Sequence, residues 1–215
     1  MTRDIFIIGA GGFGREAVWT LERINAAADE PAWKILGFAD DDPAKATGAL
    51  EGYPLLGSVE KVSRDNPGAA AFIAVGDNAI RESIYRRLRG HDFPAITDPS
   101  ADIAPTVDMR HGVFIGPQAV VSVGAELGKF AIVNARAGIG HDSKLGDFSQ
   151  ICPGATLSGH TVVGTHAMVS SNACTVPGVT IGTHARIAAG LPVYGNVADG
   201  ATVSPFGTFK TADMK

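Results

Sequence analysis

The adjacent pair His141–Asp142 is the clearest candidate for chemistry in the sequence, because it interrupts a small, apolar and glycine-rich segment, GIGHDSKLGD, at 138–147. An imidazole can accept a proton near neutral pH, and a neighbouring carboxylate can hold the ring in one tautomer. The pair could therefore act as a general base. Adjacent residues of a strand point to opposite faces, so these two side chains can meet only if a corner turns the backbone between them.

A second motif that could bind a ligand lies near the N-terminus. GAGGFGRE contains glycines with the G-x-G-x-x-G spacing, between an apolar run at 4–10 and a helical pattern at 13–27. In that context, backbone N–H groups at the start of a helix can bind a pyrophosphate. We predict that the nucleotide contacts come from Gly9, Ala10, Gly11, Gly12, Phe13 and Gly14. The alternative is that the glycines only make a tight strand-to-helix turn.

The elements around this loop alternate between strand and helix patterns. Apolar runs at 34–40 and 70–77 read as further strands, and 79–90 reads as an amphipathic helix that ends at a glycine. This alternation predicts a small parallel sheet with crossover helices over residues 1–97, a Rossmann-like half domain. Asp40 and Asp41 end the second strand, where acidic side chains can accept hydrogen bonds from a ribose or a base.

From residue 103 onward the sequence follows a six-residue repeat. Every sixth residue is aliphatic, from Ile103 to Val193, apart from Thr175. A small residue often stands four positions later, and a glycine often follows the aliphatic directly. Large and small side chains that alternate inward would fill a narrow prism of short parallel strands, and the glycines would allow its corners. We therefore predict a parallel β-helix over residues 98–215, with a short C-terminal tail.

The repeat resembles that of the hexapeptide-repeat acyltransferases, which coil into a left-handed parallel β-helix with three hexads per turn. IIGAGGFGREA and GFADDD, followed by such a β-helix, resemble the bacterial nucleotide-sugar N-acetyltransferases that act on 4-amino-4,6-dideoxy sugars, in the sialic acid O-acetyltransferase-like family. The resemblance covers essentially the whole chain. It implies a homotrimer that uses acetyl-CoA as co-substrate, with no metal. The N-terminal domain would hold the nucleotide sugar and the β-helix would hold acetyl-CoA.

The resemblance also implies the substrate and the roles of single residues. It favours GDP-perosamine in the O-antigen branch of lipopolysaccharide synthesis; UDP- or dTDP-linked amino sugars and the O-acetylation of sialic acid are the alternatives. His141 would be the general base for direct attack, with Asp142 as its orienting partner. Asn134 would approach the amino sugar, and the Gly159 N–H would face the thioester carbonyl. At the position of Gln150, some relatives have a second histidine that contacts acetyl-CoA. The tail at 203–210 also differs from the ending that is common in the family.

Three other kinds of protein share parts of this pattern. A dehydrogenase would explain the glycine fingerprint, but only about 95 residues precede the repeats, which is half of a dinucleotide-binding fold. A zinc carbonic anhydrase would use His160, His166 and His184; the last two are one coil apart, whereas His160 should lie on another side of the prism. The third alternative is a trimeric scaffold that binds a sugar nucleotide without turning it over.

Composition limits the partners and the location. A net charge of −4 and a pI near 5.8 argue against binding to nucleic acid or to an anionic membrane. No run of about 20 apolar residues could span a bilayer, and the N-terminus does not read as a secretory signal. Cys152 and Cys174 have no metal-ligand spacing and are expected to be small buried residues. These features predict a cytoplasmic protein.

Overall fold

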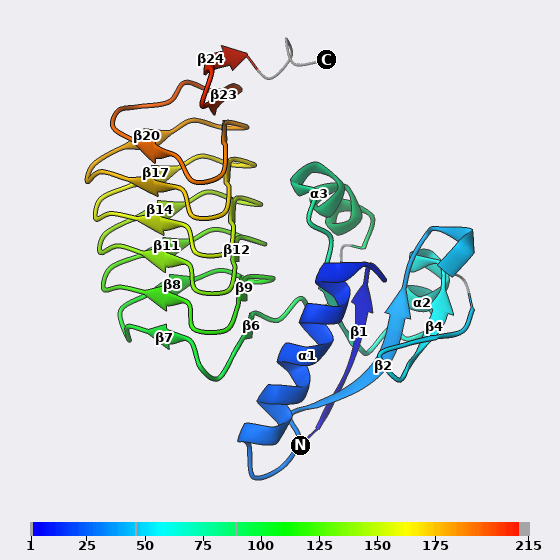
Figure 1. Ribbon diagram of the computed structural model, residues 1–215. Helices are drawn as coiled ribbons and strands as arrows, with labels where there is room; N and C mark the ends of the chain where they lie inside the picture. The colour runs from blue at the N-terminus through cyan, green and yellow to red at the C-terminus, as the bar shows by residue number, and fades with distance from the viewer. Residues whose placement is uncertain (1, 46, 89, 211–215) are drawn as a thin grey trace. The chain divides into compact units, whose positions relative to one another are not determined.

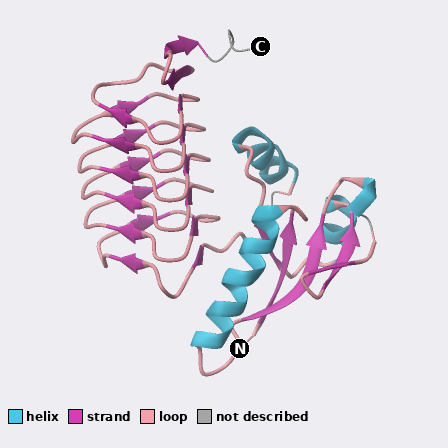
Figure 2. Ribbon diagram, in the orientation of Figure 1, coloured by secondary structure: helices cyan, strands magenta, loops and turns pink. Residues whose placement is uncertain are grey.

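The chain forms two compact units that divide between Pro99 and Ser100. The computed structural model describes residues 2–45, 47–88 and 90–210 (Figure 1). The N-terminal unit is an α/β domain and the C-terminal unit consists of short strands in stacked coils (Figure 2). The boundary predicted after residue 97 falls at the end of β6 (Ile96–Thr97), the last strand before the division.

The N-terminal unit is built on a five-stranded sheet with the order β3-β4-β2-β1-β5. Its pairs are parallel, except that β3 runs antiparallel to β4 at the edge. Its strands are β1 (Arg3–Ile8), β2 (Trp33–Ala39), β3 (Ala49–Leu50), β4 (Tyr53–Gly57) and β5 (Ala70–Ile73), and its helices are α1 (Gly12–Ala27), α2 (Val59–Asp65), α3 (Asn78–Arg87) and the short 3-10 helix η1 (Pro43–Lys45).

The apolar pattern accounts for the core of this unit. The centre of β1 is completely buried, as expected for a strand that is covered on both faces. Helix α1 starts one residue before the predicted helix and buries Ala17, Val18 and Leu21. The predicted strand 70–77 is too long, because Asp77 caps α3 by accepting hydrogen bonds from the N–H groups of Ala79 and Ile80. The predicted helix 79–90 begins at Asn78, and residue 89 lies outside the described residues.

The C-terminal unit is a β-helix of parallel two-residue strands that form three sheets, and its last two strands are four residues long and antiparallel to each other. The first sheet has the order β22-β19-β16-β13-β10-β7, the second β20-β17-β14-β11-β8, and the third runs β24-β23-β21-β18-β15-β12-β9. The strands are β7 (Asp102–Ile103), β8 (Asp108–Met109), β9 (Phe114–Ile115), β10 (Val120–Val121), β11 (Glu126–Leu127), β12 (Ile132–Val133), β13 (Gly138–Ile139), β14 (Lys144–Leu145), β15 (Gln150–Ile151), β16 (Thr156–Leu157), β17 (Val162–Val163), β18 (Met168–Val169), β19 (Cys174–Thr175), β20 (Thr180–Ile181), β21 (Arg186–Ile187), β22 (Pro192–Val193), β23 (Ala201–Ser204) and β24 (Gly207–Lys210).

Each hexad contributes one strand, and the predicted aliphatic is its second residue. From Ile115 onward these residues are buried, and small residues such as Ala119 and Ala137 fill the space between them. Stacked partners are one coil apart, as in the register of Val121, Ile139 and Leu157. The alternation of large and small residues therefore fills the prism as predicted.

The corners of the β-helix are formed differently from the prediction. The glycines that follow the aliphatics do not turn the chain; they allow close approach of the next coil, since a Cβ on Gly164 would lie 2.5 Å from the amide nitrogen of Thr183. The turning residue stands three positions after the aliphatic and has a left-handed backbone, with φ between 55° and 60° at Phe130, Asp142 and His184, for example. Other corners place a glycine there, such as Gly124.

The cysteines differ from each other. Cys152 is buried, and burial raises the pKa of its thiol to about 11. The expectation of burial is wrong for Cys174, which is exposed because it is the first, outward-pointing residue of β19. Neither cysteine forms a disulfide.

Across the described ranges, no helix is long and apolar enough to cross a bilayer.

The close stacking of coils predicts the effect of a single methyl group. We expect Gly164→Ala to lower the free energy of unfolding by about 1–3 kcal/mol, because the coils must separate to admit it. Gly138→Ala is the matched control, since its Cβ would lie 3.4 Å from Cγ2 of Thr156, an ordinary contact. Urea denaturation followed by circular dichroism measures both. An equal loss of stability in the two variants would contradict this explanation of the glycines.

Candidate active site

His141 and Asp142 meet at the corner between β13 and β14, where the chain passes from the first sheet to the second; we call these turns the first corner of each coil. The carboxylate Oδ2 of Asp142 lies 2.8 Å from Nδ1 of His141. Asp142 has φ of 57°, and this left-handed backbone turns its side chain back toward the preceding residue. The structure thus contains the backbone turn that the sequence requires for this contact.

Glycines in the neighbouring coils leave room for both side chains. Gly159 lies one coil after His141, and a Cβ there would lie 2.6 Å from Cε1 of the imidazole and would also contact Nε2. Gly124 lies one coil before Asp142, where a Cβ would lie 2.6 Å from Oδ1 of the carboxylate. The imidazole edge that carries Nε2 therefore faces the Gly159 backbone. Among the described residues, no acceptor binds the Gly159 N–H.

His160 also lies at this corner; from the sequence we considered it only as a carbonic anhydrase ligand and did not place it beside Asp142. It stands one coil after Asp142, also with φ of 57°. Its Nε2 lies 3.8 Å from Oδ2 of Asp142, and its ring lies edge-on to that of His141 with centroids 4.9 Å apart. The signal that could have found it is the 18-residue coil length, which stacks position 160 on position 142.

The charge on Asp142 is stabilised by its histidine neighbours. The hydrogen bond with His141 is the main cause that lowers the pKa of the Asp142 carboxyl below its usual value; partial desolvation opposes it, and the charges of His160 and His141 add to the lowering. The carboxylate accepts from Nδ1–H of His141, so Nε2 is the nitrogen that remains free to accept a proton.

A buried group of hydroxyls lies behind the first corner and explains why Thr175 breaks the aliphatic pattern. Its Oγ1 accepts a hydrogen bond from Ser158 N–H at 3.0 Å and lies 3.0 Å from Oγ1 of Thr161. Thr161 in turn donates to the carbonyl oxygen of Ser158, and Ser143 Oγ donates to the same carbonyl. Because every hydroxyl has a partner, this group can hold the corner in one conformation without leaving an unpaired polar atom.

Asn134 and Gln150 lie on another part of the coil. Asn134 follows β12 and Gln150 begins β15, both strands of the third sheet, whereas His141 follows a strand of the first sheet. The side-chain oxygen of Asn134 accepts a hydrogen bond from Ala135 N–H at 2.7 Å. Gln150 Oε1 is buried and has no hydrogen-bond partner among the described residues. One chain by itself does not bring these residues to His141.

The remaining histidines of the β-helix are also separated from the first corner. His166 and His184 follow strands of the second sheet, and their rings stack with centroids 4.7 Å apart. His160 lies at the first corner instead. The three histidines that a carbonic anhydrase site would need therefore do not meet within the chain.

The second candidate site is a cavity of about 440 Å³ within the N-terminal unit. It opens at the carboxyl ends of β1, β2 and β5, which is where open parallel sheets bind ligands. The predicted residues that line it are Gly9, Gly11, Gly12, Phe13, Asp40 and Asp41.

The glycines of the loop have separate roles. Gly9 has φ of 104°, a conformation that favours glycine. A Cβ on Gly14 would collide with the carbonyl oxygen of Gly9, so Gly14 permits close packing of α1 on β1. Gly11 and Gly12 face open space, and their N–H groups have no acceptor among the described residues. Those two amides, at the start of α1, suit a phosphate.

The acidic residues of the loop after β2, predicted to accept hydrogen bonds from the nucleotide, already accept hydrogen bonds within the protein. Asp40 accepts hydrogen bonds from the N–H groups of Ala10 and Asp42, and Lys45 Nζ lies 3.3 Å away. Burial would raise the pKa of this carboxyl, but these bonds outweigh it and lower the pKa. The Ala10 amide, which we predicted to contact the ligand, is therefore already bound to Asp40.

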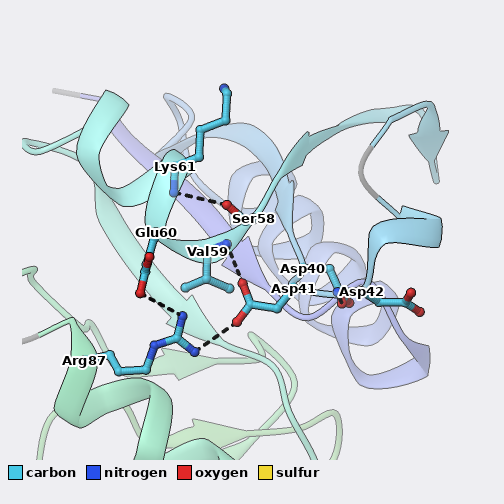
Figure 3. Close-up of polar contacts among 8 residues, drawn as sticks. All are labelled: Asp40, Asp41, Asp42, Ser58, Val59, Glu60, Lys61 and Arg87. Carbon is cyan, nitrogen blue, oxygen red and sulfur yellow. Dashed lines mark hydrogen bonds and ion pairs between the residues drawn. The ribbon is translucent and has the colours of Figure 1, made fainter.

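Asp41 joins three segments around the cavity, as Figure 3 shows. It accepts a hydrogen bond from the Val59 N–H at 2.9 Å and forms an ion pair with Arg87, also at 2.9 Å. Arg87 and Lys45 both line the cavity, and the sequence analysis found neither of them. They bring two cationic groups to a cavity that also holds free backbone N–H groups.

A buried arginine fixes one wall of the same cavity. Arg81 donates to the carbonyl oxygen of Val75 and to Oδ1 of Asn78, each at 2.9 Å. Burial lowers the pKa of its guanidinium to about 10. Arg81 thereby holds the loop between β5 and α3, which includes the lining residues Val75 and Gly76.

Comparison with known proteins defines the class. Residues 4–88 match the PglD N-terminal domain family. Across the chain, the structure is similar to perosamine N-acetyltransferase from Caulobacter crescentus, in a histidine-to-asparagine variant in complex with CoA and GDP-perosamine (27% identity, 96% of this chain and 95% of that chain, TM-score 0.87). It is equally similar to the acetyltransferase domain of PglB from Neisseria gonorrhoeae in complex with acetyl coenzyme A (27% identity, 98% and 100%, TM-score 0.87). WeeI from Acinetobacter baumannii shares the fold (24% identity, 97% and 99%, TM-score 0.69).

These comparisons confirm the predicted fold class, an α/β domain followed by a left-handed parallel β-helix, and the predicted class of enzyme, an acetyltransferase. Within that class, they also confirm the resemblance to the nucleotide-sugar N-acetyltransferases.

The geometry of the pair predicts how Asp142 titrates. Its carboxylate is stabilised in the folded protein, so the stabilisation is present above the usual pKa of aspartate and is lost as the pH falls through the lowered value. We expect His141→Asn to move the Asp142 midpoint upward, toward the usual pKa. Carboxyl ¹³C NMR titration measures it, with His184→Asn as control because that residue follows a strand of the second sheet and lies at another corner. A midpoint that is unchanged in His141→Asn would contradict the assigned cause.

Proposed function

We propose that the protein transfers acetyl from acetyl-CoA to the 4-amino group of a nucleotide-linked 4-amino-4,6-dideoxy sugar, and that the sugar nucleotide is GDP-perosamine. The observation that carries the proposal is the 2.8 Å contact between His141 Nδ1 and Asp142, which directs the free Nε2 toward an exposed corner. The choice of GDP-perosamine is supported by the similar C. crescentus enzyme, which was captured with that molecule and CoA.

In the proposed reaction, the amine attacks the thioester carbonyl directly. The C–N bond forms while the amine proton passes to Nε2 of His141, and the C–S bond then breaks to release CoA as a thiolate, which can take up that proton. Asp142 stabilises the imidazolium that forms in between. The Gly159 N–H, which has no acceptor in the described chain, is the proposed donor to the thioester oxygen as that oxygen becomes negative.

The N-terminal cavity is the proposed nucleotide site. The free N–H groups of Gly11 and Gly12 would bind a phosphate, and the charges of Lys45 and Arg87 would add to the attraction. Asp40 and Asp41 would act mainly by positioning the loop and Arg87, since both carboxylates already accept hydrogen bonds within the protein. Phe13 also lines the cavity and offers an apolar surface.

The assembly and the location are further parts of the proposal. Asn134 and Gln150 belong to the third sheet and His141 follows the first, so they can reach one reaction centre only if a second copy of the chain supplies them. A homotrimer with sites between adjacent β-helices would do this, with Asn134 near the amino sugar and Gln150 near acetyl-CoA. A cytoplasmic location follows from the two proposed substrates, and the product would enter surface polysaccharide synthesis.

The test is release of free CoA thiol from acetyl-CoA with a panel of GDP-, UDP- and dTDP-linked 4-amino-4,6-dideoxy sugars, and with sialic acid. We expect turnover on GDP-perosamine above the others. Preference for a UDP or dTDP sugar would contradict the proposed substrate but would support the proposed acetyl transfer. No turnover on any member by a folded protein would contradict the function and favour a binding scaffold.

Substitution of two histidines distinguishes loss of the general base from loss of the fold. We expect His141→Asn to lower kcat by roughly 10²–10⁴-fold while acetyl-CoA binding is retained, since general bases contribute about that much. His184→Asn is the matched control and should keep normal turnover, because it lies at another corner. More than about a tenth of the normal rate in His141→Asn would remove this residue from the base role.

A further inference from the structure

The first corner brings three possible metal ligands together. Oδ2 of Asp142 lies 2.8 Å from Nδ1 of His141 and 3.8 Å from Nε2 of His160. One ligand atom from each of the three residues lies within 4.8 Å of the others. In residues 2–45, 47–88 and 90–210, this is the one group in which three such side chains converge. The side chains are 52–64% exposed, so an ion can reach them from solvent.

We propose that His141, Asp142 and His160 bind a divalent transition-metal ion of the zinc type, and that this ion inhibits the enzyme. Two imidazole nitrogens and one carboxylate oxygen form a donor set that Zn²⁺ accepts, with water in the fourth position. Ligand distances of about 2.0–2.1 Å around a tetrahedral ion correspond to ligand atoms roughly 3.3–3.4 Å apart. The present separations lie on either side of that value, so modest side-chain rotations assemble the site.

The backbone supports this arrangement. Asp142 and His160 stand one coil apart at the same hexad position, both with φ of 57°, so their side chains leave the corner from stacked positions. Glycine at position 124 leaves space on the other side of the Asp142 carboxylate. His166 and His184 also stack, but among the described residues no third ligand converges with them. Two neighbouring imidazoles alone therefore do not distinguish the site; the Asp142 carboxylate beside His141 and His160 does.

The inhibition follows from the tautomer of His141 and rests on the function proposed above. A metal ion takes the lone pair of Nδ1, so the proton that Nδ1 shares with Asp142 must leave it, and Nε2 then carries the only N–H of the neutral ring. Nε2 no longer has a lone pair to accept the proton of the attacking amine. The ion also removes the Asp142 carboxylate from its role toward the imidazole. It is thus an inhibitor and not a cofactor, in keeping with the prediction that the reaction uses no metal.

The binding test uses the full-length, tag-free protein after treatment with a chelator, because a histidine tag would bind the same ions. Co²⁺ is the probe, since its d–d absorption reports a site with nitrogen and oxygen ligands, and Zn²⁺ should displace it. We expect one Co²⁺ per chain at this site. His160→Asn removes one ligand and keeps the fold, because asparagine adopts the left-handed backbone readily. His184→Asn, at the same hexad position of another corner, is the matched control.

We expect the Co²⁺ affinity of His160→Asn to fall at least about ten-fold, since even outer-shell partners contribute that much, and that of His184→Asn to stay at the wild-type value. Inhibition of acetyl transfer by Zn²⁺ should weaken in parallel. Product is followed by chromatography, because the released CoA thiol itself binds zinc. Absence of Co²⁺ absorption in the wild type, or equal affinity in wild type and His160→Asn, would overturn the site. Co²⁺ binding as expected in a protein with no acetyl transfer would support the site and overturn the inhibition together with the proposed function.

Discussion

The left-handed backbone conformation three residues after the inward aliphatic, found at each corner from Gly112 to Gly190, is the constraint on which the β-helix and its site depend. It turns the chain at these corners, and equivalent positions stack 18 residues apart. At another corner, residues in this conformation stack their rings on one another, as His166 and His184 do. At Asp142 the same conformation points a carboxylate back at His141, so that the residue that turns the chain also orients the imidazole.

Stacking of the coils then decides what each side chain at the corner can contact. Gly159 and Gly124 leave the imidazole and the carboxylate room, the hydroxyls around Thr175 hold the corner from inside, and His160 reaches Asp142 from the next coil. The residues of the N-terminal cavity are brought together in another way, because they meet at the carboxyl ends of parallel strands. There, Asp41 and Arg87 come together from distant segments through the sheet order.

The sequence predicts those features that depend on local periodicity, and it misses those that depend on tertiary contacts. The aliphatic repeat, the glycine fingerprint and the His141–Asp142 pair are all visible because their spacing is short. Lys45 and Arg87 are not visible, since nothing near them in the sequence indicates that they line the same cavity as Gly11. His160 is an intermediate case: the repeat contains its position, but its relation to Asp142 appears only when hexads are read three at a time. The role of Gly164 was misread because close approach of coils and turning of the chain both favour glycine.

The corner at Asp142 holds the His141 ring with its proton on Nδ1 and leaves Nε2 free, and the proposed reaction depends on this. The most direct measurement is ¹⁵N NMR of the histidine side chains in the metal-free protein at a pH where the ring is neutral, with His141→Asn used to assign the signals. We expect the proton to reside on Nδ1 of His141 and Asp142→Asn to reduce this preference. A protonated Nε2 in the wild type would rule out His141 as the base, because that nitrogen could not accept the amine proton.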